Sequence, residues 1–526
     1  QTTGKVLDRA GGVSSVGAAI TGNLPGVITE ASTGMPGEED PRIVIRGRSS
    51  WNGSDPLILV EGIERPMTSV DISSVESISV LKDASATAVF GVKGANGVIL
   101  ITTKRGVEGK ASIRVGANAT LKAPSKLPGK YDAYDALSIR NSAIEYELGV
   151  RPDAWANITP VGIINKYRNP ANLEESERYP NVDWADALFE DYAISYNANL
   201  NVTGGTRFVK YFAGVDFLHE GDLFKKWDNN RGYNTGYGFN RLNVRSNLDF
   251  QLTPTTILKV NLSGSHGAKR SPWGASGNEY TMWQGAYSVA PDVFLPKYSD
   301  GTWGYYEPAP VAATNSAQNL AIAGNMLKTT TRMNTDFTLD QDLSMFVNGL
   351  NLKGTISWDN VFVETERGIT DLNNGTQAKW INPETGEVRW KESYDGDNRF
   401  DFEEGRKWTT SPGVMENWST QRTLYSQLQL NYGIRLGKHD ITAMGLFSRD
   451  EMATGSQIPH YREDWVFRAT YGFNDRYFID YNGAYNGSEK FSKDHRFAFF
   501  SSGGIGWMVS EEKFMKGLKF LDMFKL

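Results

Sequence analysis

The sequence predicts a mainly β protein in which a small α+β domain precedes a transmembrane antiparallel β-barrel. Three observations support this fold class. Residues 107–526 repeatedly alternate apolar and polar side chains, and a period of two is typical of strands with two different faces. Aromatic residues make up 12% of the chain while the mean hydropathy is only −0.42, which is typical of membrane barrels. Residues 1–106 contain short Val- and Ile-rich segments between turn residues, which indicates a separate small sheet.

The small domain is predicted to contain several short strands and two short helices. One helix is expected within residues 16–27, broken at Pro25. The other is expected over residues 83–91, where Asp83 can cap the N-terminus and Gly91 can end the helix. The predicted strands are residues 42–47, 56–62, 75–81 and 98–103.

The longer part of the chain is predicted to be built from hairpins. Strands of about ten residues, with short turns at one end and long polar loops at the other, are typical of outer-membrane barrels. A soluble β-sandwich or propeller remains the alternative, because its strands also alternate. The paired strands are residues 195–203 with 209–217, 242–252 with 257–265, 334–343 with 350–358, and 424–436 with 440–447.

Two long loops, residues 270–310 and 370–408, are expected to lie outside the barrel. Exposed aromatic rings beside hydrogen-bonding groups can stack on sugar faces or on peptide side chains. Packing of each ring within its own loop, or against another subunit, remains the alternative. The rings of the first loop include those of Trp273, Trp283, Trp303, Tyr305 and Tyr306.

The composition disfavours most catalytic and cofactor sites. The net charge of −6 argues against a nucleic-acid partner. The absence of cysteine excludes disulfides, thiolate metal sites and cysteine nucleophiles. The five histidines are scattered, no motif of a zinc protease, serine hydrolase or nucleotide-binding loop is present, and Gly91, Gly94 and Gly97 have the spacing of tight turns. We predict no enzyme, no cofactor and no metal site, although a glycosidase with two carboxylates stays open as an alternative.

Several segments resemble one family of transporters. "RIVIRGRSS" (residues 42–50), "DPLILVEGIE" (55–64) and "DISSVESISVLKDASATAVFGVKGANGVILITTKRG" (71–106) resemble the plug domain of the SusC/RagA family of TonB-dependent outer-membrane transporters. Residues 473–514, with a Gly-Ser-x-x-Phe loop and a Gly-Trp-x-x-Ser-Glu-Glu turn, resemble a barrel segment of that family. The resemblance implies that residues 1–106 are a plug domain inside a barrel of about twenty-two strands, and that residues 107–526 are the N-terminal portion of this barrel.

The resemblance also implies partners and a location. A SusC-type transporter lies in the lipid of the outer membrane of a Gram-negative, Bacteroidetes-like bacterium. It receives substrate from a SusD-like lipoprotein lid, is energised by TonB with ExbB and ExbD, and can form a dimer of transporter–lipoprotein pairs. The sequence has no recognisable TonB box and stops where the barrel is about half finished. Because an open strand edge in lipid is costly, we expect the chain to be a portion of a longer protein.

Three functions stay open on the sequence. The first is TonB-dependent import of oligosaccharides or similar polymer fragments, and the second is TonB-dependent uptake of peptides, iron chelates or cobalamin. The third is an exported glycan-binding β protein without transport. The polar side chains of residues 242–252 are expected to form an interface between plug and barrel, namely Asn243, Arg245, Asn247, Asp249 and Gln251. The candidate ligand-binding residues are Trp51, Asn52 and Asp55 in the plug and Trp273, Trp303, Tyr305 and Tyr306 in the first long loop.

Overall fold

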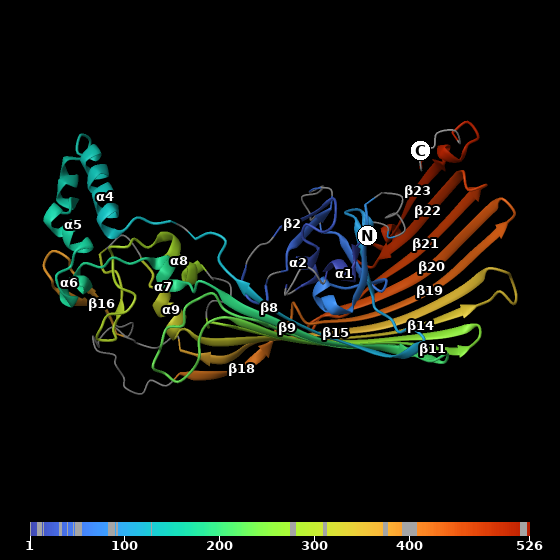
Figure 1. Ribbon diagram of the computed structural model, residues 1–526, viewed down its shortest axis with the longest axis horizontal. Coiled ribbons are helices and arrows are strands. Elements are labelled where there is room, and N and C mark those ends of the chain that lie inside the picture. The colour runs from blue at the N-terminus through green and yellow to red at the C-terminus, as the bar shows by residue number, and fades with distance from the viewer. Residues whose placement is uncertain are drawn as a thin grey trace.

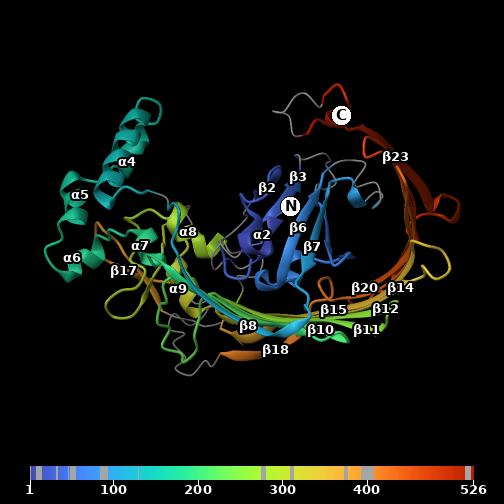
Figure 2. The same cartoon turned by 45° about the vertical axis from the view of Figure 1, so that its right-hand side comes forward.

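The protein consists of a large curved sheet, a small N-terminal domain on the concave face of that sheet, and a lobe of loops at one end (Figure 1). The sheet, which we call the wall, curves around the small domain from β8 to β23 (Figure 2). The computed structural model describes residues 2–526 except residues 8–12, 14, 31–33, 39, 46, 48–54, 83–89, 91–92, 128, 274–279, 309–312, 372–376, 392–407 and 516–522.

The small domain contains a five-stranded sheet in the order β1-β6-β7-β4-β5. Apolar side chains from this sheet and from two short helices form one core, which includes Leu7, Ile20, Val60, Ile78 and Ile101. The predicted strands are confirmed. The expected helix over residues 83–91 lies outside the described residues apart from Phe90. The elements are β1 (Thr2–Thr3), α1 (Gly4–Leu7), α2 (Val16–Ile20), β2 (Val27–Glu30), β3 (Arg42–Ile45), β4 (Leu57–Val60), β5 (Ile63–Glu64), η2 (Met67–Ser69), η3 (Ile72–Ser74), β6 (Val75–Leu81) and β7 (Val98–Thr103).

The wall is a thirteen-stranded sheet whose main strands follow one another in sequence order. All four predicted hairpins are confirmed, and the strands extend beyond the predicted ranges. Within the described residues, β8 and β23 each pair with one other wall strand, so the sheet is open. The strands are β8 (Gly109–Lys122), β9 (Ala193–Gly205), β10 (Val209–Glu220), β11 (Gly238–Thr253), β12 (Thr256–Ser271), β14 (Gly324–Asp342), β15 (Leu350–Thr370), β18 (Thr409–Met415, paired with β15), β19 (Gln421–Leu436), β20 (His439–Thr454), β21 (His460–Phe473), β22 (Tyr477–Ser488) and β23 (Phe497–Trp507).

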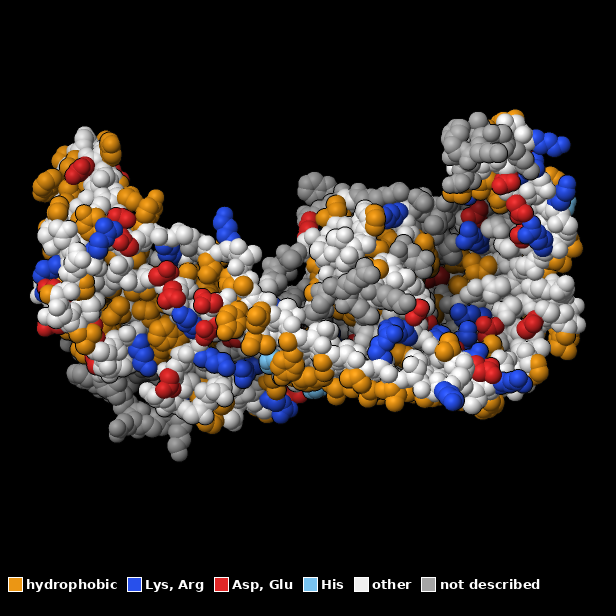
Figure 3. Space-filling view, in the orientation of Figure 1, with side chains coloured by type: hydrophobic (Ala, Val, Ile, Leu, Met, Phe, Trp, Pro, Cys, Tyr) orange, Lys and Arg blue, Asp and Glu red, His pale blue; other side chains and the backbone are white. Residues whose placement is uncertain are grey.

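The two faces of the wall differ in chemistry. On β15, Ile356 and Trp358 point outward and are 57% and 58% exposed, whereas Ser357 and Asp359 between them point inward and are buried. Hydrophobic side chains accordingly gather along the convex side of the sheet (Figure 3). So many exposed apolar side chains on one face are typical of contact with lipid. Among the described helices, none has the length and apolar character needed to cross a membrane.

The lobe is formed by loops that leave one end of the wall. Its core contains Trp184, Phe224, Phe294 and Trp303. From the sequence we predicted long loops at residues 270–310 and 370–408 and made no prediction for residues 123–192. This last segment folds into helices, of which the first begins at the N-cap Asp132, whose side chain accepts a hydrogen bond from the Asp135 backbone. The elements of the lobe are α4 (Ala133–Glu147), η5 (Pro152–Asn157), α5 (Val161–Arg168), α6 (Leu173–Arg178), α7 (Trp184–Leu188), α8 (Tyr280–Ser288), β13 (Trp303–Gly304), α9 (Ser316–Ile322), β16 (Ala378–Ile381) and β17 (Val388–Trp390).

Candidate functional site: the interface between small domain and wall

Polar side chains of β11 contact the small domain, as the sequence predicted. Arg245 donates a hydrogen bond to the Ser69 carbonyl (3.3 Å), and Asn247 donates to the Lys104 carbonyl (2.7 Å). These side chains are buried together with Asn243. Gln251 differs from the prediction, because it donates to the Thr253 carbonyl at the end of its own strand.

A single arginine of the small domain binds two aspartates of the wall. Arg65, which follows β5, donates from Nε and Nη2 to the two carboxylate oxygens of Asp359, both at 2.7 Å. It also donates to both oxygens of Asp336 and to Ser357 Oγ (3.0 Å), and Ser357 donates to Asp336 (2.8 Å). We call these four residues the Arg65 cluster.

Burial makes the Arg65 cluster sensitive to the loss of any charge. The side chains of Arg65 and Asp336 are each 4% exposed. Burial alone would lower the pKa of Arg65, but hydrogen bonds and charges from Asp359 and Asp336 outweigh it and raise the pKa above its ordinary value. Removal of one partner from such a buried ion pair leaves an uncompensated charge, which costs about 3–5 kcal/mol.

A second ionic contact lies where β7 leaves the small domain. Arg105 donates to Glu61 (2.8 Å) and to Asp249 of β11 (2.7 Å), and Glu61 also accepts hydrogen bonds from the backbone and hydroxyl of Thr103 (2.6 and 2.8 Å). Burial alone would raise the pKa of Glu61, but the Arg105 charge and these hydrogen bonds hold it below its ordinary value. Glu61 has a φ of 55°, which is unfavourable for a side-chain-bearing residue, so these bonds hold a strained turn in place.

The outer tip of the small domain contacts both the wall and the lobe. In this apex segment, residues 34–38, the Gly37 backbone donates to Glu220 of β10 (2.7 Å) and Glu38 forms an ion pair with Lys269 of β12. Met35 is buried in the core of the lobe. Gly37 has a φ of 78°, and a Cβ there would lie 2.8 Å from the ring of Phe239, so this position requires glycine.

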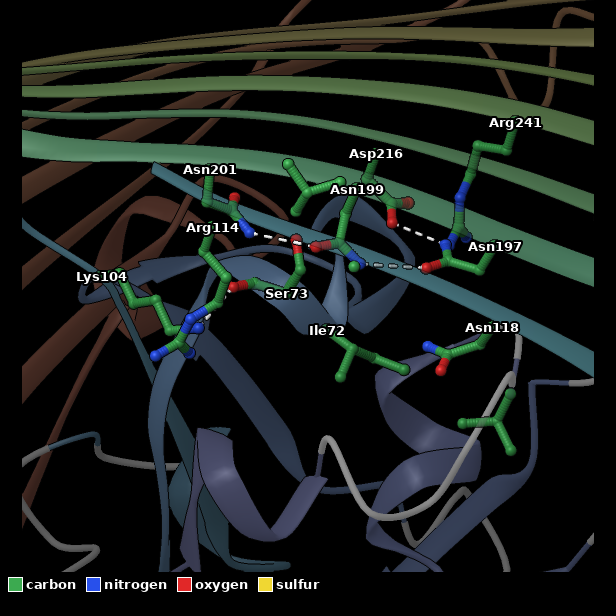
Figure 4. Close-up of a pocket in the computed structure, with 13 residues that line it drawn as sticks. Ile72, Ser73, Lys104, Arg114, Asn118, Asn197, Asn199, Asn201, Asp216 and Arg241 are labelled. Atoms are coloured by element: carbon green, nitrogen blue, oxygen red, sulfur yellow. Dashed lines mark hydrogen bonds between the residues drawn. The ribbon is translucent and has the colours of Figure 1, made fainter. Parts of the chain in front are cut away.

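A polar cavity of about 210 Å³ lies between the small domain and the first strands of the wall (Figure 4). Three asparagines of β9 line it in a row: Asn201 donates to Asn199 and Asn199 donates to Asn197, both at 3.4 Å. Asn197 in turn donates to Asp216 of β10 (2.6 Å). Ser73 and Lys104 line the opposite side. A polar space of this size has room for bridging water. Because water can replace the polar contacts here, the small domain can move relative to β9 and β10 without loss of apolar contacts.

The structure does not bring all the predicted ligand-binding residues together. Trp51 and Asn52 lie outside the described residues, and Asp55 is an exposed residue of the small domain that accepts a hydrogen bond from Arg42 (3.2 Å). Ligand contact by any of these side chains stays a prediction.

The loop aromatics divide into two groups. Trp303 is only 3% exposed and packs in the lobe core, as the packing alternative describes. Tyr305 and Tyr306 are half-buried against the same core, and Tyr306 lies edge-on to Trp380 at 6.2 Å. Trp273 is also half-buried and follows the end of β12. Tyr305, Tyr306 and Trp273 therefore keep part of their surface available for a ligand.

The Arg65 cluster was not predicted from the sequence. Asp336 lies within the predicted strand 334–343, Asp359 directly follows the predicted strand 350–358, and Arg65 lies three residues after the predicted strand 56–62. The partners, however, are separated by 271 and 294 positions. No local spacing signals a contact across such distances.

The comparisons with known proteins agree with this architecture. A family model for the TonB-dependent Receptor Plug Domain matches residues 1–98. The chain is 24% identical to the TonB-dependent receptor SusC of Bacteroides thetaiotaomicron over 96% of this chain and 49% of SusC. It is 23% identical to the TonB-dependent receptor P26 of Formosa agariphila over 98% of this chain and 49% of that protein. The chain thus spans about half the length of these relatives.

A solved structure of the RagAB peptide importer has the same fold. It superposes with a TM-score of 0.70 at 18% identity, over 97% of this chain and 57% of the other chain. The plug-domain match and the fold are similar to those of TonB-dependent receptors, with the small domain on the inner face of the wall. The chain is SusC/RagA-like, as the sequence resemblance predicted.

Proposed function

We propose that this chain is the plug domain (residues 1–106) and the N-terminal barrel portion (residues 107–526) of a SusC-like importer in the bacterial outer membrane. The observation that supports this most strongly is the Arg65 cluster, with the polar contacts around it. These contacts hold the small domain against the wall through charged and polar groups. A domain held in this way can move away from the wall as a folded unit once the charged contacts break.

The proposed partners act on opposite ends of the plug. A SusD-like lipoprotein would cover the lobe and deliver substrate, and TonB with ExbB and ExbD would pull the plug from the periplasmic side. The apex segment supports communication between the two, because Met35 packs in the lobe core while Gly37 and Glu38 contact the wall. A change in the lobe on ligand binding would therefore reach the plug directly.

Oligosaccharides or similar polymer fragments are the proposed substrates. Partly exposed rings beside polar groups suit sugar faces, and Trp273, Tyr305 and Tyr306 are the candidates that retain exposed surface. A peptide substrate is the second candidate, because a protein of the same fold is a peptide importer. A ligand-binding protein without transport is less consistent with the apolar outer face of the wall.

The transport proposal is tested with the full-length protein in its own membrane. Deletion of the TonB box should abolish growth on the cognate polymer, because binding alone cannot concentrate a substrate. Undiminished uptake by that variant would refute the proposal. Recovery of the intact wild-type protein from the soluble fraction without detergent would favour the binding protein instead.

The substrate is tested with loop variants. Trp273→Ala and Tyr305→Ala should each weaken ligand binding by about tenfold, whereas Trp155→Ala, an exposed tryptophan of η5 at 66% exposure, serves as the matched control. Calorimetric titrations with an oligosaccharide mixture and with a peptide mixture distinguish the two substrate classes. Equal binding by all three variants would refute the proposed ligand contacts.

A further inference from the structure

We propose that the outer face of the wall carries a specific binding groove for a phosphate-bearing membrane lipid, formed along β15, β19 and β20. This inference rests on the proposed function in one respect, namely that the outer face contacts lipid. Two adjoining hollows on that face have volumes of about 510 Å³ and 390 Å³. Successive outward residues of β15 connect them, because Gly354 and Ile356 line the first hollow and Trp358 lines the second.

Small residues on the floor and large apolar residues at the sides give the first hollow its shape. Gly354 lies directly between Leu339 of β14 and Leu428 of β19 in the strand register. A Cβ at Gly354 would meet only one atom within reach, Leu428 Cδ1 at 4.0 Å, so the space above the glycine is open. Phe337 and Phe447 also line this hollow. An apolar trough with these sides fits a hydrocarbon chain.

The second hollow lies nearer the lobe end of the strands and contains a free cation. Arg422 is the second residue of β19 and lines this hollow with Trp358 and Leu424. The side chain of Arg422 forms no hydrogen bond or ion pair with any residue that the structure describes, although its backbone is paired with Asn360 and Ala453 in the sheet. By contrast, Arg449, an outward arginine of β20, pairs with Glu463 (3.6 Å) and lies over the ring of Tyr461 (5.0 Å).

The length and polarity of the groove match one leaflet of a bilayer. Arg422 and Leu428 are six positions apart, or about 20 Å along a strand. With the tilt of about 40° that strands have in membrane barrels, this is about 15 Å of depth, or half of a hydrocarbon core of about 30 Å. Arg422 lies toward the long loops, which face the exterior in outer-membrane barrels. A lipid of the outer leaflet would therefore place its acyl chain over Gly354 and its phosphate at Arg422, since guanidinium groups bind phosphate in a bidentate manner.

One acidic residue opposes this arrangement and provides an internal check. Glu451 is paired with Leu424 in the strand register and lines the same hollow as Arg422. Its carboxylate would repel a phosphate, so Glu451→Gln should strengthen lipid binding while Arg422→Gln should weaken it. Opposite effects of two neutralising substitutions in one hollow are expected only if the ligand is anionic.

The experiment uses the full-length protein in a non-ionic detergent and native mass spectrometry. The probe is dimyristoyl phosphatidic acid, with dimyristoylglycerol and inorganic phosphate as the chain-only and head-only probes. The wild type should bind phosphatidic acid at least tenfold more tightly than either of the other two. Arg422→Gln and Gly354→Leu should each reduce this binding about tenfold. Arg449→Gln should leave it unchanged, as should Gly445→Leu on β20, where a Cβ also meets open space.

Three results would overturn the proposal. The first is equal binding of phosphatidic acid by Arg422→Gln, Gly354→Leu and both control variants. The second is binding of inorganic phosphate as tight as that of the lipid, which would indicate a site for soluble anions. The third is a protein dimer that Gly354→Leu abolishes, which would assign the groove to a second copy. Membrane fractionation of each variant separates these outcomes from failure of the proposed function, which would leave the protein outside the membrane.

Discussion

Replacement of Arg65 by alanine should weaken the attachment of the plug to the wall. The substitution leaves Asp336 and Asp359 buried without a cation, and the loss of one partner from a buried ion pair costs about 3–5 kcal/mol. Because each 1.4 kcal/mol is a factor of ten in an equilibrium, the population in which the plug has moved away from the wall should rise by about two to three and a half orders of magnitude. The Gly37 amide donates to Glu220 of the wall, so its hydrogen exchange in the full-length protein measures this population directly.

The matched control is Arg42→Ala in the same domain. Arg42 pairs with Asp55 at 3.2 Å, but the two side chains are 42% and 72% exposed, and exposed pairs contribute about 0–1 kcal/mol. Exchange should therefore change little in this variant. A triple variant, Arg65→Met with Asp336→Asn and Asp359→Asn, should recover most of the protection, because a buried ion pair can be replaced by neutral groups at little cost. Equal exchange in Arg65→Ala and Arg42→Ala would refute the reasoning.

Three further predictions concern the plug and its neighbours. Arg105 and Thr103 lower the pKa of Glu61. The ionised Glu61 side chain therefore stabilises the fold above its ordinary pKa of 4.5, and this stabilisation is lost as the pH falls through the lowered pKa. Thermal unfolding at several pH values should show this loss in the wild type and not in Glu61→Gln. Burial raises the pKa of Asp222, in the loop after β10, to about 6 from 3.8. The folded loop therefore binds more protons between these values and loses stability as the pH rises through them, which hydrogen exchange should detect in the wild type and not in Asp222→Asn. Gly37→Ala should weaken contact between the apex segment and the wall by about 1–3 kcal/mol, because the positive φ and the Phe239 ring both oppose a Cβ; unchanged proteolysis of the apex segment would contradict this.

The sequence predicted the β architecture because its cause is local. Each wall strand alternates between two environments, so Ile356 and Ser357 identify their own faces without knowledge of their neighbours. The polar face of β11 could be assigned to the plug interface for the same reason. The Arg65 cluster and the apex contacts could not be predicted, since they depend on which strands become neighbours across more than 180 positions.

The aromatic loop residues show a different limitation. From the many aromatic residues of the loop, we predicted that Trp303 and Tyr305 contact a ligand. The structure instead places Trp303 in the core of the lobe. Loops of this length can bury some of their own rings, and the sequence does not reveal which rings are buried. The helices of residues 133–188 were missed because those after α4 are short. The longer α4 has little segregation of apolar side chains to one face.

The two faces of the wall can be tested most directly with single cysteines, because the chain has no native cysteine. Spin labels at Ile356→Cys and Gln429→Cys, in the full-length protein in bilayers, report contact with oxygen dissolved in lipid and with a water-soluble nickel chelate. We predict that the label at position 356 contacts oxygen and not the chelate. The label at position 429, a half-buried residue on the inner face between the outward Leu428 and Leu430, should not contact lipid-dissolved oxygen. Access of the nickel chelate to position 356 would contradict a lipid-facing wall with the plug on its inner side.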